Sequence, residues 1–178
     1  MTISNPDNIQ KAIEFASLKH KSQKVPGSDE PYLQHIMLVT SEVLMISDGK
    51  FDKQKAVMCA ILHDILEDTN TEYSELVVRF GDNVAKGVLA LTKNEKLPHE
   101  ERMNDSLHRI YAEGREVAIV KMADRISNLR KPPEFWTLEK KMKYRDEAAL
   151  IYEKLSGFNA NIAKRLLSKI NDYEAYIE

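Results

Sequence analysis

The chain lacks the features of a secreted, disulfide-linked or membrane-spanning protein. Cys59 is the only cysteine among 178 residues, so no intramolecular disulfide can form. Its place in an apolar run favours a small buried side chain over a reactive thiol. No apolar run approaches the roughly 18 residues of a membrane span, and the N-terminus lacks the pattern of a signal peptide. We therefore expect a cytoplasmic protein that does not bind membranes.

Glycine, proline and excess charge are scarce as well. The chain has six Gly and six Pro, and its net charge is −2. So small a net charge gives no indication of nucleic-acid binding. The Gly and Pro residues fall between segments of helical periodicity, and no strand-like alternation is sustained. The sequence therefore predicts an all-α protein, with a single domain over residues 1–178.

Apolar periodicity predicts helices over most of the chain. They cover about 8–22, 33–46, 52–67, 71–80, 83–91, 99–113, 116–129, 138–155 and 160–176. This pattern is typical of a helical bundle of about eight or nine helices. The segment 56–62 is nearly all apolar, which indicates a central helix that is buried on every side.

Four polar side chains stand together at the end of that apolar segment: His63, Asp64, Glu67 and Asp68. On a continuous helix His63 and Glu67 would share one face, and Asp64 and Asp68 the neighbouring face. The simpler interpretation is an acidic helix end, but acids at a C-terminus oppose the helix dipole. Carboxylates and an imidazole crowded together need a cation or strong partners, so the motif indicates a metal site.

His35 and Asp124 add polar groups from two distant segments that are predicted as core-facing helices. Alone, His35 would be interpreted as a core histidine, and Asp124 as a partner of Lys121 or Arg125. Burial of an unpaired Asp charge costs several kcal/mol, however. Two imidazoles and two carboxylates suit a first-row divalent ion with positions open for water and substrate. The other histidines have no ligand-spaced partner and are predicted to face solvent: His20, His99 and His108.

These segments resemble a known family. His35, the pair His63-Asp64 and Asp124 resemble the H…HD…D signature of the HD-domain superfamily of metal-dependent phosphohydrolases. This resemblance implies an HD-domain helical bundle, and it covers about residues 12–155, which is most of the chain.

The likeness is closer to one group within that superfamily. His63-Asp-Ile-Leu-Glu-Asp68 resembles the H-D-x-x-E-D motif of RelA/SpoT-type alarmone hydrolases. The segments 31–35 and 121–129 resemble that group's flanking motifs. No synthetase or regulatory segment follows, so the chain resembles a small stand-alone (p)ppGpp hydrolase.

The resemblance implies a site and a reaction. Four residues would ligate one divalent ion: His35, His63, Asp64 and Asp124. Mn²⁺ is the expected metal, with Fe, Zn or Mg as alternatives. Glu67 and Asp68 would act on the attacking water as general base or orienting groups. The reaction would remove the 3′-pyrophosphate from guanosine 3′,5′-bis(diphosphate), leaving GDP and pyrophosphate.

The expected substrate contacts are Lys24 and Asn128. Asn128 lies one turn beyond the expected ligand on its helix, where it would bind ribose or phosphate or simply end the helix. The family usually has an Arg-Lys pair ahead of Pro-Tyr, whereas the loop 21–30 offers Lys24. Ile36 stands where the family often has Pro. These differences leave open another nucleotide or a phosphorylated dinucleotide such as NADPH. A homo-oligomer and a non-enzymatic nucleotide sensor also stay open.

Overall fold

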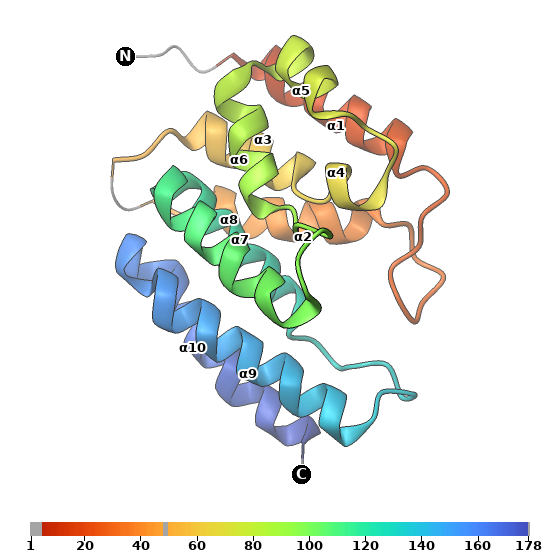
Figure 1. Cartoon of the computed structure of the whole chain (residues 1–178), viewed down its shortest axis with the longest axis vertical. Coiled ribbons are helices and arrows are strands. Elements are labelled where there is room, and N and C mark those ends of the chain that lie inside the picture. Colours follow the sequence, from red (N-terminus) through yellow and green to blue (C-terminus); the bar gives the residue numbers. More distant parts are fainter. Residues whose placement is uncertain (1–4, 48–49, 178) are drawn as a thin grey trace.

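The computed structural model describes residues 5–47 and 50–177, and these ranges are mostly helical (Figure 1). The α-helices in chain order are α1 (Pro6–Lys19), α2 (Leu33–Leu44), α3 (Lys53–Leu62), α4 (Ile65–Asp68), α5 (Tyr73–Phe80), α6 (Asp82–Leu91), α7 (His99–Glu113), α8 (Arg115–Asn128), α9 (Leu138–Leu155) and α10 (Ala160–Tyr173). Two short 3₁₀ turns follow α9 and α10: η1 (Ser156–Phe158) and η2 (Glu174–Tyr176). The only extended pairing in the described ranges is an isolated bridge between Lys24 and Pro31. The all-α prediction is confirmed.

Polar side chains begin several of these helices by accepting hydrogen bonds from first-turn backbone N–H groups. Such caps satisfy donors that have no partner within the helix. The capping residues are Asn5 for α1, Asp52 for α3, Thr137 for α9 and Asn159 for α10. Pro6 also stands at the start of α1, where its missing N–H costs nothing.

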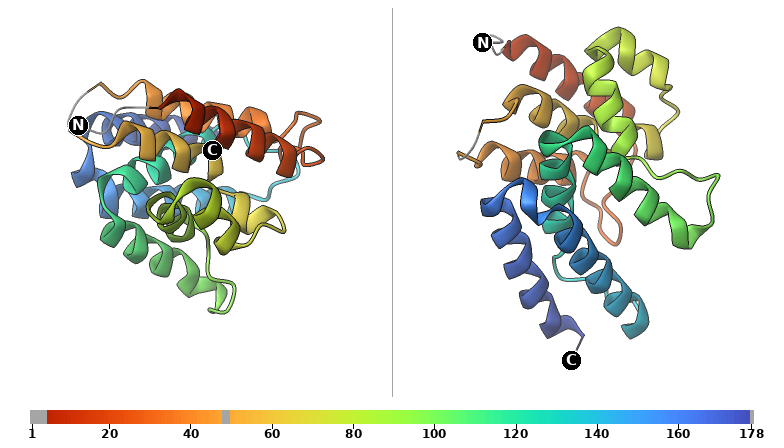
Figure 2. Two further views of the ribbon diagram at one scale, coloured as in Figure 1. Left: turned by 90° about the horizontal axis from the view of Figure 1, so that it is seen from above. Right: turned by 60° about the vertical axis from the view of Figure 1, so that its left-hand side comes forward.

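Helices α3 and α8 form the centre of the bundle. Residues 55–62 of α3 and 117–127 of α8 are all buried, which confirms the predicted central helix. Figures 1 and 2 show α1 and α5 at one end of the molecule and the α9–α10 pair at the other. One cluster of buried apolar side chains runs through these layers. No described helix has the length and apolarity needed to cross a membrane. The single domain over 1–178 stays a prediction.

The predicted helix over 52–67 is wrong in one respect, because it is interrupted at His63 and Asp64. The Nδ1 atom of His63 donates to the carbonyl of Ala60 at 2.8 Å. In a continuous helix that carbonyl would accept from the N–H of Asp64. Asp64 instead has φ −101° and ψ 2° and stands at the start of α4. The position of Glu67 is therefore set by the break in the helix, and not by a helical face shared with His63.

Helix α6 approaches α3 closely at Gly87. A Cβ atom at this position would lie 2.7 Å from Sγ of Cys59 and 3.2 Å from Cγ2 of Val117. Both of those side chains are fully buried, and dense packing leaves them little room to move. Cys59 is thus a buried thiol, as the sequence predicts, and burial raises its pKa to about 12.

Gly87→Ala should lower the free energy of unfolding by about 1–3 kcal/mol, the usual cost of overpacking, although Ala is the better helix former. Urea denaturation would measure the change. Gly157→Ala is a matched control, because a Cβ there meets nothing within 4 Å. The control should be neutral or stabilising by up to about 1 kcal/mol. A Gly87→Ala variant as stable as the wild type would contradict this close approach.

Candidate metal centre

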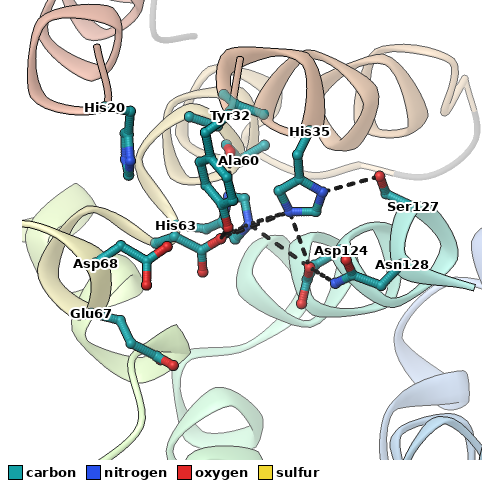
Figure 3. A network of polar contacts seen from close by, with 12 residues as sticks. His20, Tyr32, His35, Ala60, His63, Glu67, Asp68, Asp124, Ser127 and Asn128 are labelled. Carbon is teal, nitrogen blue, oxygen red and sulfur yellow. Dashed lines mark hydrogen bonds and ion pairs between the residues drawn. The ribbon is translucent and has the colours of Figure 1, made fainter. Parts of the chain in front are cut away.

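Two imidazoles and two carboxylates converge from different elements (Figure 3). His35 lies on α2, His63 and Asp64 lie between α3 and α4, and Asp124 lies on α8. Nε2 of His63 is 3.2 Å from Nε2 of His35 and 2.8 Å from Oδ2 of Asp64. Oδ1 of Asp124 is 3.5 Å from Nε2 of His35 and 3.8 Å from that of His63. The structure thus brings all four predicted ligands together.

Their spacing fits a single cation. Bonds of about 2.0–2.2 Å to nitrogen and oxygen place neighbouring ligand atoms about 3–3.5 Å apart. The ligand atoms of His35, His63 and Asp64 all lie within 4.8 Å of one another, and Asp124 faces both imidazoles. Because the set offers nitrogen and oxygen without thiolate, it suits a first-row divalent ion. Four protein ligands would leave further positions free on a five- or six-coordinate ion.

Hydrogen bonds behind the imidazoles aim their Nε2 atoms into the centre. Since a carbonyl only accepts, Nδ1 of His63 carries the proton in its bond to Ala60, and Nε2 is left as the ligand atom. Nδ1 of His35 lies 3.3 Å from Oγ of Ser127. Contacts with the protein therefore turn Nε2 of both rings toward the centre.

Donors from the protein also fix the two carboxylates. The Tyr32 hydroxyl donates to Oδ2 of Asp64. Nζ of Lys121 lies 3.1 Å from Oδ2 of Asp124, and Nδ2 of Asn128 donates to its Oδ1 at 2.5 Å. The ion pair between Asp124 and Lys121, which the sequence left open, therefore exists. It uses Oδ2 of Asp124, whereas Oδ1 faces the imidazoles.

The neighbouring charges keep both acids ionised, although Asp124 is buried and Asp64 partly buried. Burial alone would raise the pKa of Asp64, but the His63 imidazole outweighs it and lowers that pKa to about 2. Lys121 and the imidazoles likewise hold the pKa of Asp124 well below its ordinary value. Burial lowers the pKa of His63, whereas the two carboxylates raise it to about 9. Burial and Asp64 raise the pKa of Tyr32, so its hydroxyl remains a donor.

Glu67 and Asp68 lie to one side of this cluster, on α4 (Figure 3). Lys93, in the loop between α6 and α7, binds both oxygens of Glu67. Its Nζ lies 2.8 Å from Oε1, and its backbone N–H donates to Oε2 at 3.1 Å. Nε2 of Gln23 donates to Oδ2 of Asp68 at 2.7 Å. Partial burial of its carboxyl group raises the pKa of Asp68, against the opposing effect of that bond. The sequence carried no signal for either partner.

The prediction that His20 faces solvent is wrong, since only 3% of it is exposed. Its ring stacks on Tyr32 with centroids 5.1 Å apart. Its Nδ1 lies 2.6 Å from Oε1 of Gln23, the residue that binds Asp68. Helix α1 ends at Lys19 and not near residue 22, and the chain then turns toward the site. Ligand spacing alone gave no sign of this, whereas His99 and His108 are exposed as predicted.

A cavity of about 650 Å³ opens beside the metal centre, next to His35 and Asn128. Arg130, Lys131 and Trp136 form part of its wall. Asn128 therefore borders both the cavity and the carboxylate of Asp124.

Lys24 is placed differently from Asn128. Its ammonium donates to the carbonyl of Asp29, within its own loop, at 2.5 Å. Among the described residues, the wall of the cavity does not include Lys24. The structure thus brings one of the two predicted substrate contacts to the site and leaves the other on the loop.

Added Mn²⁺ should raise the Tm of the wild-type protein, because a ligand that binds only the folded state stabilises that state. At a free concentration of 100 times the Kd, the gain in the free energy of unfolding is about 2.7 kcal/mol. Differential scanning fluorimetry with and without chelator would measure the shift. His63→Ala should abolish it, whereas His108→Ala, at an exposed histidine, should retain it. An equal rise in His63→Ala would contradict the site.

Tyr32→Phe should weaken metal binding by about 10- to 100-fold, the usual effect of removing a hydrogen bond that orients a ligand. Calorimetric titration with Mn²⁺ would measure the affinity. Tyr111 is 64% exposed, so Tyr111→Phe is the control and should leave affinity unchanged. Wild-type affinity in Tyr32→Phe would show that Asp64 needs no such orientation.

The chain is similar to known proteins over much of its length. It is 29% identical to guanosine-3′,5′-bis(diphosphate) 3′-pyrophosphohydrolase MESH1 of Danio rerio over 171 residues, which are 93% of this chain and 94% of that protein. It is 34% identical to guanosine-3′,5′-bis(diphosphate) 3′-pyrophosphohydrolase of Aquifex aeolicus over 155 residues. Those residues make up 84% of this chain and 21% of that longer protein.

A solved structure shares the fold. It belongs to a metazoan orthologue of SpoT described as hydrolysing ppGpp, and it matches with a TM-score of 0.81 at 24% identity, covering 96% of this chain and 97% of that one. The sequence pattern of the family described as HD domain matches residues 12–159. This match spans most of the chain and all four converging side chains, and the chain therefore belongs to the HD domain family.

Proposed function

We propose that this protein is a divalent-metal-dependent pyrophosphohydrolase that converts guanosine 3′,5′-bis(diphosphate) to GDP and pyrophosphate. The observation that carries the proposal is the convergence of two imidazoles and two carboxylates, with Glu67 and Asp68 beside them. The relative from Danio rerio, which aligns over nearly the whole chain, bears the name of this activity. We also propose that the protein acts in the cytoplasm, where nucleotides are abundant.

Four side chains would hold the ion: His35, His63, Asp64 and Asp124. A divalent cation supplies Lewis acidity, which polarises a phosphoryl oxygen and makes water a stronger acid. We propose Mn²⁺ because the nitrogen and oxygen ligands suit a first-row ion, with Fe, Zn or Mg as alternatives.

Glu67 and Asp68 would handle the attacking water. Its oxygen forms a bond to the phosphorus next to the ribose, and the bond between that phosphorus and the 3′ oxygen breaks. We assign Glu67 as the base that accepts the water proton, because its carboxylate is held in place beside the ligands by Lys93. Asp68, steadied by Gln23, would orient the water. The proton returns to the 3′ oxygen, which leaves GDP.

The cavity beside His35 is the proposed nucleotide site. Its volume of about 650 Å³ lies within the usual range of small-molecule sites. Asn128, at its border, would hydrogen-bond ribose or phosphate, while Arg130 and Lys131 offer positive charge to the 5′ phosphates. Lys24 is exposed, and we keep it as a proposed phosphate contact at the rim of the cavity.

Purified protein with Mn²⁺ should release pyrophosphate and GDP in equal amounts from guanosine tetraphosphate. Glu67→Gln should lower kcat by about 10²- to 10⁴-fold, the usual contribution of a general base, and should keep the Tm rise with metal. Glu72→Gln, at an exposed position, is the control and should retain wild-type kcat. Failure of metal-loaded protein to turn over any of a panel of phosphorylated nucleotides would overturn the proposal.

The second candidate is a metal-dependent phosphohydrolase that acts on a phosphorylated dinucleotide such as NADPH. The observation in its favour is the loop 21–30, which lacks the Arg-Lys pair and holds Lys24 against its own backbone. Values of kcat/KM measured side by side would decide between the substrates. A higher value for NADPH would replace the alarmone as substrate and leave the metal chemistry unchanged.

A further inference from the structure

Lys93 binds Glu67 through its backbone N–H and through its side-chain ammonium, and the ammonium is the more mobile of the two groups. The backbone N–H binds Oε2 at 3.1 Å, and the ammonium binds Oε1 at 2.8 Å. The Lys93 side chain is 45% exposed, and its Nζ has no other hydrogen bond within residues 5–47 and 50–177. A carboxylate oxygen that accepts a bond from a cation is a weaker proton acceptor. Glu67 is thus well placed but partly blocked as a base.

The backbone N–H of Lys93 is held in place, because two arginines of α7 hydrogen-bond to carbonyls of the loop between α6 and α7. Nη2 of Arg109 donates to the carbonyl of Thr92 at 2.8 Å. Nε of Arg102 donates to the carbonyl of Leu97 at 2.9 Å, and its Nη2 binds a second loop carbonyl. The N–H of Lys93 can therefore keep hold of Oε2 even when the ammonium moves.

The carboxylates of the metal centre also act on the ammonium through their charge. Partial burial lowers the pKa of Lys93, but Glu67 and, beyond it, Asp64 and Asp124 raise it above its ordinary value. The other lysine near these acids, Lys121, is buried and bound to Asp124. Lys93 is thus a partly exposed cation bound to the residue proposed to accept the proton of the attacking water. A pyrophosphate group carries more negative charge than one carboxylate and would compete for this ammonium.

We propose that Lys93 exchanges Glu67 for the pyrophosphate group of the substrate. In the free protein the ammonium covers Oε1 of Glu67. In the complex it binds a phosphate oxygen, and Oε1 is free to accept the proton of the attacking water while the backbone N–H holds Oε2. The exchange rests on the proposed function, and it makes the base available only when an anionic substrate is present.

Binding of inorganic pyrophosphate, measured by calorimetry with Mn²⁺ present, tests the exchange without turnover. Lys93→Met should weaken binding by about 10- to 100-fold, because a charge-assisted hydrogen bond is lost. Lys93→Arg keeps the cation and should stay within about threefold of the wild type. Lys96→Met removes an exposed charge from the same loop and should leave affinity unchanged. Each variant should retain the Tm rise with metal, which verifies its folding.

Steady-state kinetics separates the exchange from a fixed ion pair. Lys93→Met should raise KM by a factor similar to its loss of pyrophosphate affinity and lower kcat far less than Glu67→Gln does. Wild-type pyrophosphate affinity in Lys93→Met would overturn the exchange, and so would a loss of kcat equal to that of Glu67→Gln at unchanged KM. The predicted loss of pyrophosphate affinity in Lys93→Met, found in a protein that turns over no nucleotide, would overturn the proposed function. That result would leave the role of Lys93 in binding unchanged.

Discussion

Two carboxylate charges held beside two imidazoles, with Asp124 buried and Asp64 partly buried, are the constraint on which this structure depends. Asp124 cannot stay ionised away from water without compensation, since an unpaired buried charge costs several kcal/mol, and the partly buried Asp64 needs partners for the same reason. The compensation comes from Lys121, Tyr32 and the imidazoles, which the packing of α2, α3 and α8 holds in place. The two central helices are buried along most of their length, and their dense packing keeps these groups in one geometry.

One hydrogen bond links the backbone to the chemistry. The bond from Nδ1 of His63 to the carbonyl of Ala60 sets the tautomer of the ring and replaces a helical backbone bond. The helix therefore ends there, and the short α4 that follows places Glu67 and Asp68 on one side of the cluster. The same contact thus prepares a metal ligand and positions the residues proposed to handle water.

The surroundings of the centre are divided between two tasks. On the α4 side, Lys93 binds Glu67, and a chain of contacts from His20 through Gln23 reaches Asp68. On the α8 side, Asn128 borders a cavity large enough for a nucleotide. Substitutions of Glu67 and of Asn128 can therefore test the proposed proton transfer and the proposed nucleotide contact separately.

Periodicity by itself determined the helical class and the central apolar helix, and the resemblance of three short motifs to the HD-domain family singled out the four converging side chains. These features are local, or they follow from donor chemistry that only a few residue types supply. The tertiary structure alone decided the helix break at His63, the burial of His20 and the pairing of Glu67 with Lys93. Each depends on a side chain that meets a backbone carbonyl, a ring or a carboxylate brought close by folding, and the apolar repeat of a helix carries no record of such contacts.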